Sequence, residues 1–242
     1  MYLRPFFYAS VILIMFHASC AKDNTTNTTQ GSLIKTLFRD ASPLYTSSRS
    51  YSYNSKNQLT RIDYASNQYT EFEYTGNKIV EITNIVFAQI SDTSYYFLNS
   101  QNLVDSSVTA DGLASYHYNS DGYLISKTNY DFNGDSLSVQ YLTIQNGNVI
   151  KNETIWWDGT LVESVTFSDF DANNKNTLGY ANLGQSYFGK SSVNPPKKTV
   201  VFDGSSETIF DDVFSFDTSG RITKLAHHID PDPEYVDTYT YY

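Results

Sequence analysis

Few residues in this chain could perform chemistry. The sequence contains one cysteine, Cys20, and three of its four histidines, His117, His227 and His228, lie beyond the first twenty residues. His227 and His228 are adjacent, so on a strand they would point to opposite faces and could not share a metal ion. The sequence has no Gly-x-Ser-x-Gly, P-loop or HExxH motif. We therefore expect a protein that is not an enzyme, with no catalytic residues and no cofactor.

Two acidic segments have the spacing of oxygen ligands that begins a calcium loop, at residues 131–135 and 169–173. An EF-hand loop then requires Gly at its sixth position and Glu at its twelfth. In the first segment these positions hold Ser136 and Leu142, and the second segment departs from the pattern in the same way. We interpret both segments as turns and expect no metal site.

Trp156 and Trp157 are the two tryptophans of the chain, and they are adjacent. Successive residues of a strand point to opposite faces, so one of the two should face away from the core. An exposed Trp can stack on a sugar ring or lie at a lipid headgroup boundary. We therefore treat both as candidate ligand-binding residues; the alternative is that a second sheet or a long loop covers the outward one.

The N-terminus has the pattern of an export signal. Arg4 precedes an apolar run over residues 6–16, which is too short to span a bilayer, and Ala18 and Ser19 then precede Cys20. This junction resembles the lipobox of bacterial lipoproteins, in which the cysteine becomes the lipidated first residue, although His17 stands where a Leu-like residue is usual. Residues 1–19 are predicted to be a signal peptide. The alternative is a soluble periplasmic protein in which Cys20 has no role.

The segment after the junction is polar and has no apolar periodicity. We expect residues 20–44 to comprise a lipidated Cys20 and a flexible tether rich in Thr and Asn. A multiply acylated cysteine would anchor the protein firmly to a membrane without a spanning helix. We therefore expect an outer-membrane lipoprotein of the cell envelope; the sequence leaves open the periplasmic or the surface-exposed face.

The composition excludes other classes of protein. The chain has 242 residues, of which 40% are hydrophobic, 16% aromatic and 17% charged, and 21 are tyrosines. So much aromatic surface argues against disorder, and one cysteine excludes a disulfide scaffold. The formal net charge of −10 argues against a nucleic-acid partner, because an acidic surface repels phosphates.

From about residue 45 the chain repeats one pattern: an alternating aromatic pair, a polar turn, and alternating aliphatic residues. The clearest copy is Tyr51-Ser-Tyr53-Asn-Ser-Lys-Asn-Gln-Leu59, and the last residues before the turns of successive copies are at positions 53, 74, 98, 118, 144 and 216. A period near twenty residues is expected when each unit is one β-hairpin. Alternation with a period of two places the aromatic residues on one strand face. Asp121-Gly122 and Asn146-Gly147 supply the positive φ that tight turns require.

These hairpins predict an all-β domain over residues 45–242, an antiparallel meander. So long a sheet should curl into a barrel-like or sandwich-like form, because twist accumulates and open edges attract pairing. One irregular segment, residues 168–196, interrupts the repeats, and we expect it to cap an open end of the sheet.

The tandem pattern of Tyr-x-Tyr, Asp-Gly or Asn-Gly, and Leu-x-x-Ile resembles, in diverged form, the YD repeats of Rhs-type shell proteins. Residues 45–242 are also similar to a family of Bacteroidota lipoproteins of unknown function with a porin-like β fold, most clearly at residues 217–225 and 184–196. The first resemblance implies a shell-building sheet. The second brings no catalytic residues to this chain.

Three functional hypotheses remain open. The first is a membrane-anchored envelope lipoprotein that acts as a noncatalytic binding or structural shell module, with a glycan or an envelope protein as partner. The second is a β-barrel embedded in the outer membrane, which would need outward apolar bands about ten residues long with aromatic girdles. The third is a polysaccharide hydrolase, which depends only on the abundance of acidic residues.

Overall fold

The computed structural model describes residues 32–41, 45–64, 67–229 and 235–242. The predicted signal peptide and Cys20 lie outside the described residues. Within them, the strands are β1 (Ile34–Ala41), β2 (Tyr45–Tyr53), β3 (Leu59–Tyr64), β4 (Gln68–Thr75), β5 (Lys78–Ile85), β6 (Ile90–Leu98), β7 (Val104–Thr109), β8 (Gly112–Tyr118), β9 (Leu124–Tyr130), β10 (Ser136–Gln145), β11 (Asn148–Trp156), β12 (Leu161–Phe170), β13 (Pro196–Phe202), β14 (Glu207–Phe216), β15 (Ile222–Ile229) and β16 (Tyr235–Tyr241).

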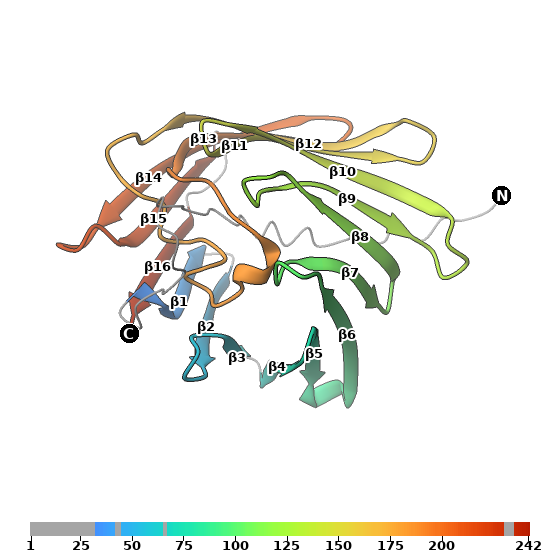
Figure 1. Cartoon of the computed structure of the whole chain (residues 1–242). Helices are drawn as coiled ribbons and strands as arrows, with labels where there is room; N and C mark the ends of the chain where they lie inside the picture. The colour runs from blue at the N-terminus through green and yellow to red at the C-terminus, as the bar shows by residue number, and fades with distance from the viewer. Residues whose placement is uncertain (1–31, 42–44, 65–66, 230–234) are drawn as a thin grey trace.

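These strands form one closed barrel (Figure 1). Each strand pairs antiparallel with its neighbours in sequence, and β1 pairs with β16 to close the ring. The prediction of an all-β antiparallel meander is confirmed, and of the two expected forms the chain adopts the barrel. Closure gives every strand two hydrogen-bonded neighbours, so no sheet edge remains open.

One expected boundary differs from the structure. The sequence predicts a flexible tether over residues 20–44, but Ile34–Ala41 form β1. The alternation that makes this segment a strand is weak, and its strand state depends on pairing with β16 and β2. Such long-range pairing leaves little local trace in a sequence.

The repeated aromatic residues face the inside of the barrel, as the alternation predicts. Tyr51, Phe72 and Tyr116 are buried in one hydrophobic core, and the core extends to the partly buried rings of Tyr53 and Tyr74. On β2 the intervening side chains are exposed residues of the outer face: Thr46, Ser48, Ser50 and Ser52. The tyrosine surplus is therefore mainly an interior feature of the barrel.

A side-chain oxygen organises the turn of several repeats. Asn119 Oδ1 accepts hydrogen bonds from the backbone N–H groups of Asp121 and Tyr123, at 3.1 and 3.0 Å. The turns that begin at Asn54, Asn99 and Asp217 have the same pair of hydrogen bonds. In each, the side-chain oxygen of the first residue accepts from the backbone N–H groups of the residues two and four positions later. Gly122 has the positive φ of +86° that this turn requires.

The irregular segment folds into one end of the barrel. Residues 171–195 connect β12 to β13 and contain the short 3-10 helix η3 (Ser186–Phe188), and Figure 1 shows this segment descending through the centre of the ring. Contacts with the wall hold it in place: Gly184 and Asn182 accept backbone hydrogen bonds from Leu59 and Ile34, at 3.3 and 3.0 Å. The predicted capping role of this segment agrees with the structure.

The outer face of the barrel carries polar and charged side chains together with exposed apolar ones. Arg61 of β3 forms ion pairs with Asp63 and with Glu71 of β4, at 2.7 and 2.8 Å, and these residues alternate with inward ones. On β14 the outward residues are, in order, Glu207, Ile209, Asp211, Val213 and Ser215. No helix among the described residues is long and apolar enough to cross a membrane.

Candidate functional site

The barrel interior contains a cavity of about 650 Å³. Its wall comes from the inward side chains of β2 to β6 and β8 to β13, and its roof comes from the inserted loop. The roof residues are Tyr180, Leu183, Gln185, Phe188, Lys190, Ser191 and Ser192. A chamber of this size lies within the range of small-molecule sites in proteins.

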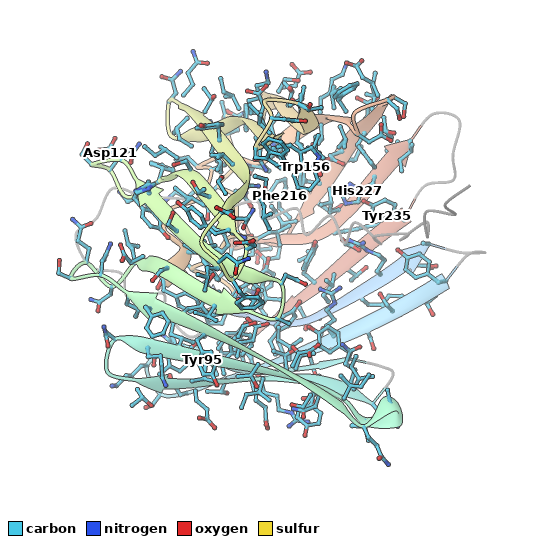
Figure 2. All side chains as sticks on the ribbon, turned by 90° about the vertical axis from the view of Figure 1, so that its right-hand side faces the viewer. Tyr95, Asp121, Trp156, Phe216, His227 and Tyr235 are labelled. Atoms are coloured by element: carbon cyan, nitrogen blue, oxygen red, sulfur yellow. The ribbon has the colours of Figure 1, made fainter. Side chains whose placement is uncertain are left out.

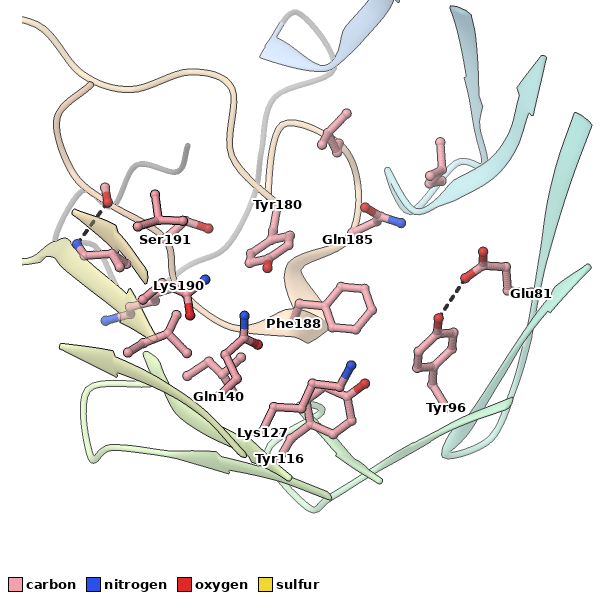
Figure 3. Close-up of a pocket in the computed structure, with 18 of the residues that line it drawn as sticks. Glu81, Tyr96, Tyr116, Lys127, Gln140, Tyr180, Gln185, Phe188, Lys190 and Ser191 are labelled. Carbon is pink, nitrogen blue, oxygen red and sulfur yellow. Dashed lines mark hydrogen bonds between the residues drawn. The ribbon is translucent and has the colours of Figure 1, made fainter. Parts of the chain in front are cut away.

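Aromatic contacts fix the roof above the wall. The Phe188 ring packs edge-on against Tyr96 of β6, with centroids 5.4 Å apart, and lies 5.5 Å from Tyr180. The neighbouring Tyr187 is buried and packs against Tyr74 of β4. Figure 3 shows Phe188 and Tyr180 between the loop and the wall. The loop is therefore a packed closure of the chamber.

Polar side chains form a row across one part of this wall. Lys127 of β9 lies opposite Gln140 of β10, Gln140 lies opposite Thr154 of β11, and Thr154 lies opposite Glu163 of β12. Directly opposite residues of antiparallel strands share a face, so all four point inward. Lys127, Gln140 and Glu163 line the cavity, and in Figure 3 the first two rise from the wall toward Phe188.

Burial affects the charged groups of the chamber. It lowers the pKa of Lys127 and raises the pKa of Glu163, because in each case desolvation disfavours the charged form. Burial also raises the pKa of Glu81, although the Tyr96 hydroxyl donates a hydrogen bond to this carboxylate at 2.9 Å. Among the described residues, neither Lys127 nor Glu163 has an ion-pair partner, so a ligand of opposite charge would stabilise each.

A second set of buried polar groups lies in the wall formed by β14, β15, β16 and β1. His227 Nδ1 lies 2.6 Å from Asp212 Oδ1, and both side chains are fully buried. The Arg39 guanidinium donates two hydrogen bonds of 2.7 Å to Asp237, which raise the pKa of Arg39 above its usual range. The ring of Tyr235 stacks on His227 with centroids 4.2 Å apart (Figure 2). These residues do not line the cavity, so we assign them to the structure of the wall.

The structure separates the candidate residues of the sequence from this chamber. Trp156 ends β11 and Trp157 follows it, at the end of the barrel away from the inserted loop; they are 47% and 74% exposed. Both tryptophans are therefore uncovered, and neither lines the cavity. His117 and His228 are exposed on outward strand positions, while His227 is buried.

The two acidic segments, residues 131–135 and 169–173, contribute to turns, as the sequence predicts. Asp131 Oδ1 accepts hydrogen bonds from the backbone N–H groups of Asn133 and Asp135, both at 2.9 Å. Asp171 accepts one from the backbone of Asn173 at 3.1 Å. Among the residues that the structure describes, no group of three or more His, Cys, Asp or Glu side chains could hold a metal ion.

Comparison with solved structures identifies the fold. A porin-like protein from Bacteroides uniformis matches with a TM-score of 0.69 at 16% sequence identity, over 91% of this chain and 100% of that chain. A porin-like protein from Bacteroides vulgatus matches with a TM-score of 0.57 at 8% identity, over 87% of this chain and 98% of that one. The barrel has a porin-like fold. No protein-family model matches the chain, and no curated protein does.

At these identities the likeness establishes the porin-like fold alone. It agrees with the fold that the resemblance to Bacteroidota lipoproteins implied, whereas lipidation and relation to Rhs repeats stay predictions. The porin-like barrel leaves a chamber that sequence reasoning missed. Lys127, Gln140 and Glu163 were not singled out because alternation separates two strand faces without showing which face lines a cavity.

Proposed function

We propose that this protein is a noncatalytic binding module of the cell envelope, which holds a small molecule in the barrel lumen and is anchored to the outer membrane through lipid on Cys20. The observation that carries the proposal is the 650 Å³ chamber, lined by aromatic and aliphatic side chains with polar and charged ones among them, and covered by a packed loop. Small-molecule sites have this combination of concave apolar lining and few placed polar groups.

The positions of the acid–base groups support a noncatalytic role. His117 and His228 are on the outer face, and His227 is paired with Asp212 outside the cavity lining. Glu81 and Glu163 both line the chamber, but they belong to β5 and β12, seven strands apart in a ring of sixteen. Glycoside hydrolysis needs two carboxyl groups no more than about 9.5 Å apart. Because Glu81 and Glu163 lie on nearly opposite walls of the barrel, their arrangement favours binding over hydrolysis.

The outer face supports a barrel that stands in water. A lipid-facing strand needs an apolar band, and an Arg or Lys at its centre costs about 2–4 kcal/mol. The outer face carries exposed apolar residues such as Tyr141, Ile209 and Val213, but charged and polar groups interrupt them: the Arg61 ion-pair cluster, the Ser and Thr row of β2, and Lys151 beside Glu153 at 2.8 Å. We therefore place the barrel beside the membrane, held by its anchor, with Trp156 and Trp157 free to contact a glycan or an envelope protein.

The second candidate function is a barrel embedded in the outer membrane. The closed ring of strands and the porin-like neighbours favour it, because both agree with the barrel that this hypothesis expected. The two candidates differ in what surrounds the outward side chains.

Labelling of the outward residue Tyr141 separates the two candidates. Tyr141 is 48% exposed and lies on the outer face of β10, opposite Glu153. In the anchored protein, the thiol introduced by Tyr141→Cys should react with a bulky polyethylene glycol maleimide. The reaction is run on envelopes that have been made permeable to the reagent but not dissolved. Absence of reaction in envelopes, with full reaction in detergent, would instead support embedding in lipid.

Lumenal binding is tested by filling the chamber. Compounds that bind the folded state at 100 times their Kd stabilise it by about 2.7 kcal/mol, which a thermal unfolding screen detects. Leu142 lines the chamber, and Thr143 is exposed on the opposite face of β10. We expect stabilising compounds to lose their effect in Leu142→Trp and to keep it in Thr143→Trp. Stabilisation that survives Leu142→Trp would contradict lumenal binding.

A further inference from the structure

The polar row of the chamber contains opposite charges that do not neutralise each other. Among the described residues, no ion pair joins Lys127 or Glu163 to an opposite charge. Lys127 instead contacts the ring of Tyr116, whose centroid lies 5.6 Å from Nζ. The other charged side chains of the lining also contact the protein: Glu81 accepts a hydrogen bond from the Tyr96 hydroxyl, Arg49 lies 5.3 Å from the Tyr64 ring, and Lys190 lies 5.9 Å from the Tyr123 ring.

The register of the strands sets the separation of these charges. Lys127 is on β9 and Glu163 on β12, three strand spacings away in one cross-strand row. At about 4.8 Å per spacing, their backbones lie roughly 14 Å apart along the wall. Both side chains point into the lumen on either side of Gln140, so their charged ends can keep about this separation. The wall thus presents a cation, an amide and a carboxylate in one line.

We propose that the chamber binds a short peptide with free termini, about three residues long, whose carboxylate contacts Lys127 and whose ammonium group contacts Glu163. This inference rests on the proposed lumenal binding function and names its ligand class. An extended chain of three residues spans about 10 Å, and a contact of about 3 Å at each end brings the total close to the roughly 14 Å length of the row. The Gln140 amide has donors and an acceptor, and it pairs with a peptide bond between the two ends.

The peptide's side chains have apolar surfaces to contact. The roof and wall around the row present the rings of Phe188 and Tyr116 together with Leu142. A neutral sugar would offer Lys127 and Glu163 hydroxyl groups but no opposite charge in a partly desolvated chamber. Hydrogen bonds between two oppositely charged groups are stronger than those to neutral groups, so the row favours a zwitterion.

Four probes test the inference on the unaltered protein by calorimetric titration: tri-alanine, N-acetyl-tri-alanine, tri-alanine amide and maltotriose. We expect tri-alanine to bind, both blocked peptides to bind at least about tenfold more weakly because each loses one charged contact, and maltotriose not to bind. Equal affinity of the three peptides, or no binding by any of them, overturns the inference. Binding of maltotriose alone overturns the peptide assignment and leaves lumenal binding standing.

Variants then assign the two ends of the ligand. In Lys127→Met, tri-alanine should bind as weakly as its amide, and in Glu163→Gln it should bind as weakly as its N-acetyl form. Lys151→Met and Glu153→Gln change the paired charges on the outer face of β11 and should leave every affinity unchanged. If Leu142→Trp binds tri-alanine as well as the unaltered protein, the peptide lies outside the lumen, which overturns both this inference and the proposed function.

Discussion

The backbone carbonyl of Gly184 accepts a hydrogen bond from the N–H of Leu59 at 3.3 Å, which joins the inserted loop to the first residue of β3. Leu59 is fully buried, and Gly184 has a φ of +67°. A Cβ on Gly184 would lie 2.7 Å from both the Leu59 nitrogen and the Asn57 carbonyl oxygen. The loop therefore approaches the wall as closely as only glycine permits.

The first prediction concerns this contact. Gly184→Ala should destabilise the barrel by about 1–3 kcal/mol more than Gly76→Ala, because overpacking adds to the cost of the left-handed backbone. Gly76 is the matched control: its φ is +60°, and a Cβ added there would have no other atom within 4 Å. Urea unfolding of both variants measures the difference. Equal losses would mean that the loop does not pack against β3 as described.

The second prediction compares an inner ion pair with an outer one. Arg39→Met should cost about 3–5 kcal/mol of unfolding free energy, because it leaves the Asp237 carboxylate, 3% exposed, without its guanidinium partner. Arg61→Met removes two exposed ion pairs, with Asp63 and Glu71, and should cost at most about 1 kcal/mol for each. The double variant Arg39→Met, Asp237→Leu should recover most of the loss. Similar costs for Arg39→Met and Arg61→Met would contradict the buried position of the first pair.

The third prediction concerns alkaline pH. Burial raises the pKa of Tyr51, Tyr180 and Tyr241 to about 12, from an ordinary value of 10.0. Since the folded state holds these protons more tightly than the unfolded chain, the stability they contribute is present below pH 10 and is lost as pH rises toward 12. Ultraviolet titration should show some phenols ionising near pH 10 and a second group ionising only at about pH 12 or on unfolding. A single transition near pH 10 would show that these tyrosines are solvated.

The fourth prediction concerns the anchor. Cys20→Ala should move the protein from the membrane fraction to the soluble fraction and abolish incorporation of labelled palmitate, because the proposed lipid chains would attach at this residue. The barrel begins beyond the anchor, so the thermal unfolding temperature should not change. Membrane association that survives the substitution would sink the lipoprotein assignment.

The sequence predicts the hairpins and the inward aromatic face because both depend on local alternation. Tyr116 and Tyr118 point inward with the period of two that their spacing indicates. The choice of barrel over sandwich depends on the pairing of β1 with β16, whose strands lie at opposite ends of the chain. No local pattern encodes a contact of that separation.

The inward position of the polar row in the chamber cannot be predicted from alternation, because the repeats contain bulges. Tyr118 pairs with Leu124 while His117 pairs with Ser126, so Ile125 is an extra residue that shifts the alternation within β9. A count by twos from Tyr118 through the turn would therefore assign Lys127 to the wrong face. The exposure of Trp156 and Trp157 likewise depends on their place at an open end of the barrel.

The central claim is that the lumen is a chamber that small molecules reach and large ones do not. It is tested most directly by thiol labelling in the Cys20→Ala background, which has no other cysteine. Gln140→Cys places a thiol in the chamber, and Tyr141→Cys places one on the outer face. We predict that a small methanethiosulfonate modifies both thiols, that a polyethylene glycol maleimide modifies only Cys at position 141, and that tri-alanine slows modification at position 140 alone. No reaction at position 140 with the small reagent, or equal reaction there with the large one, would contradict the claim.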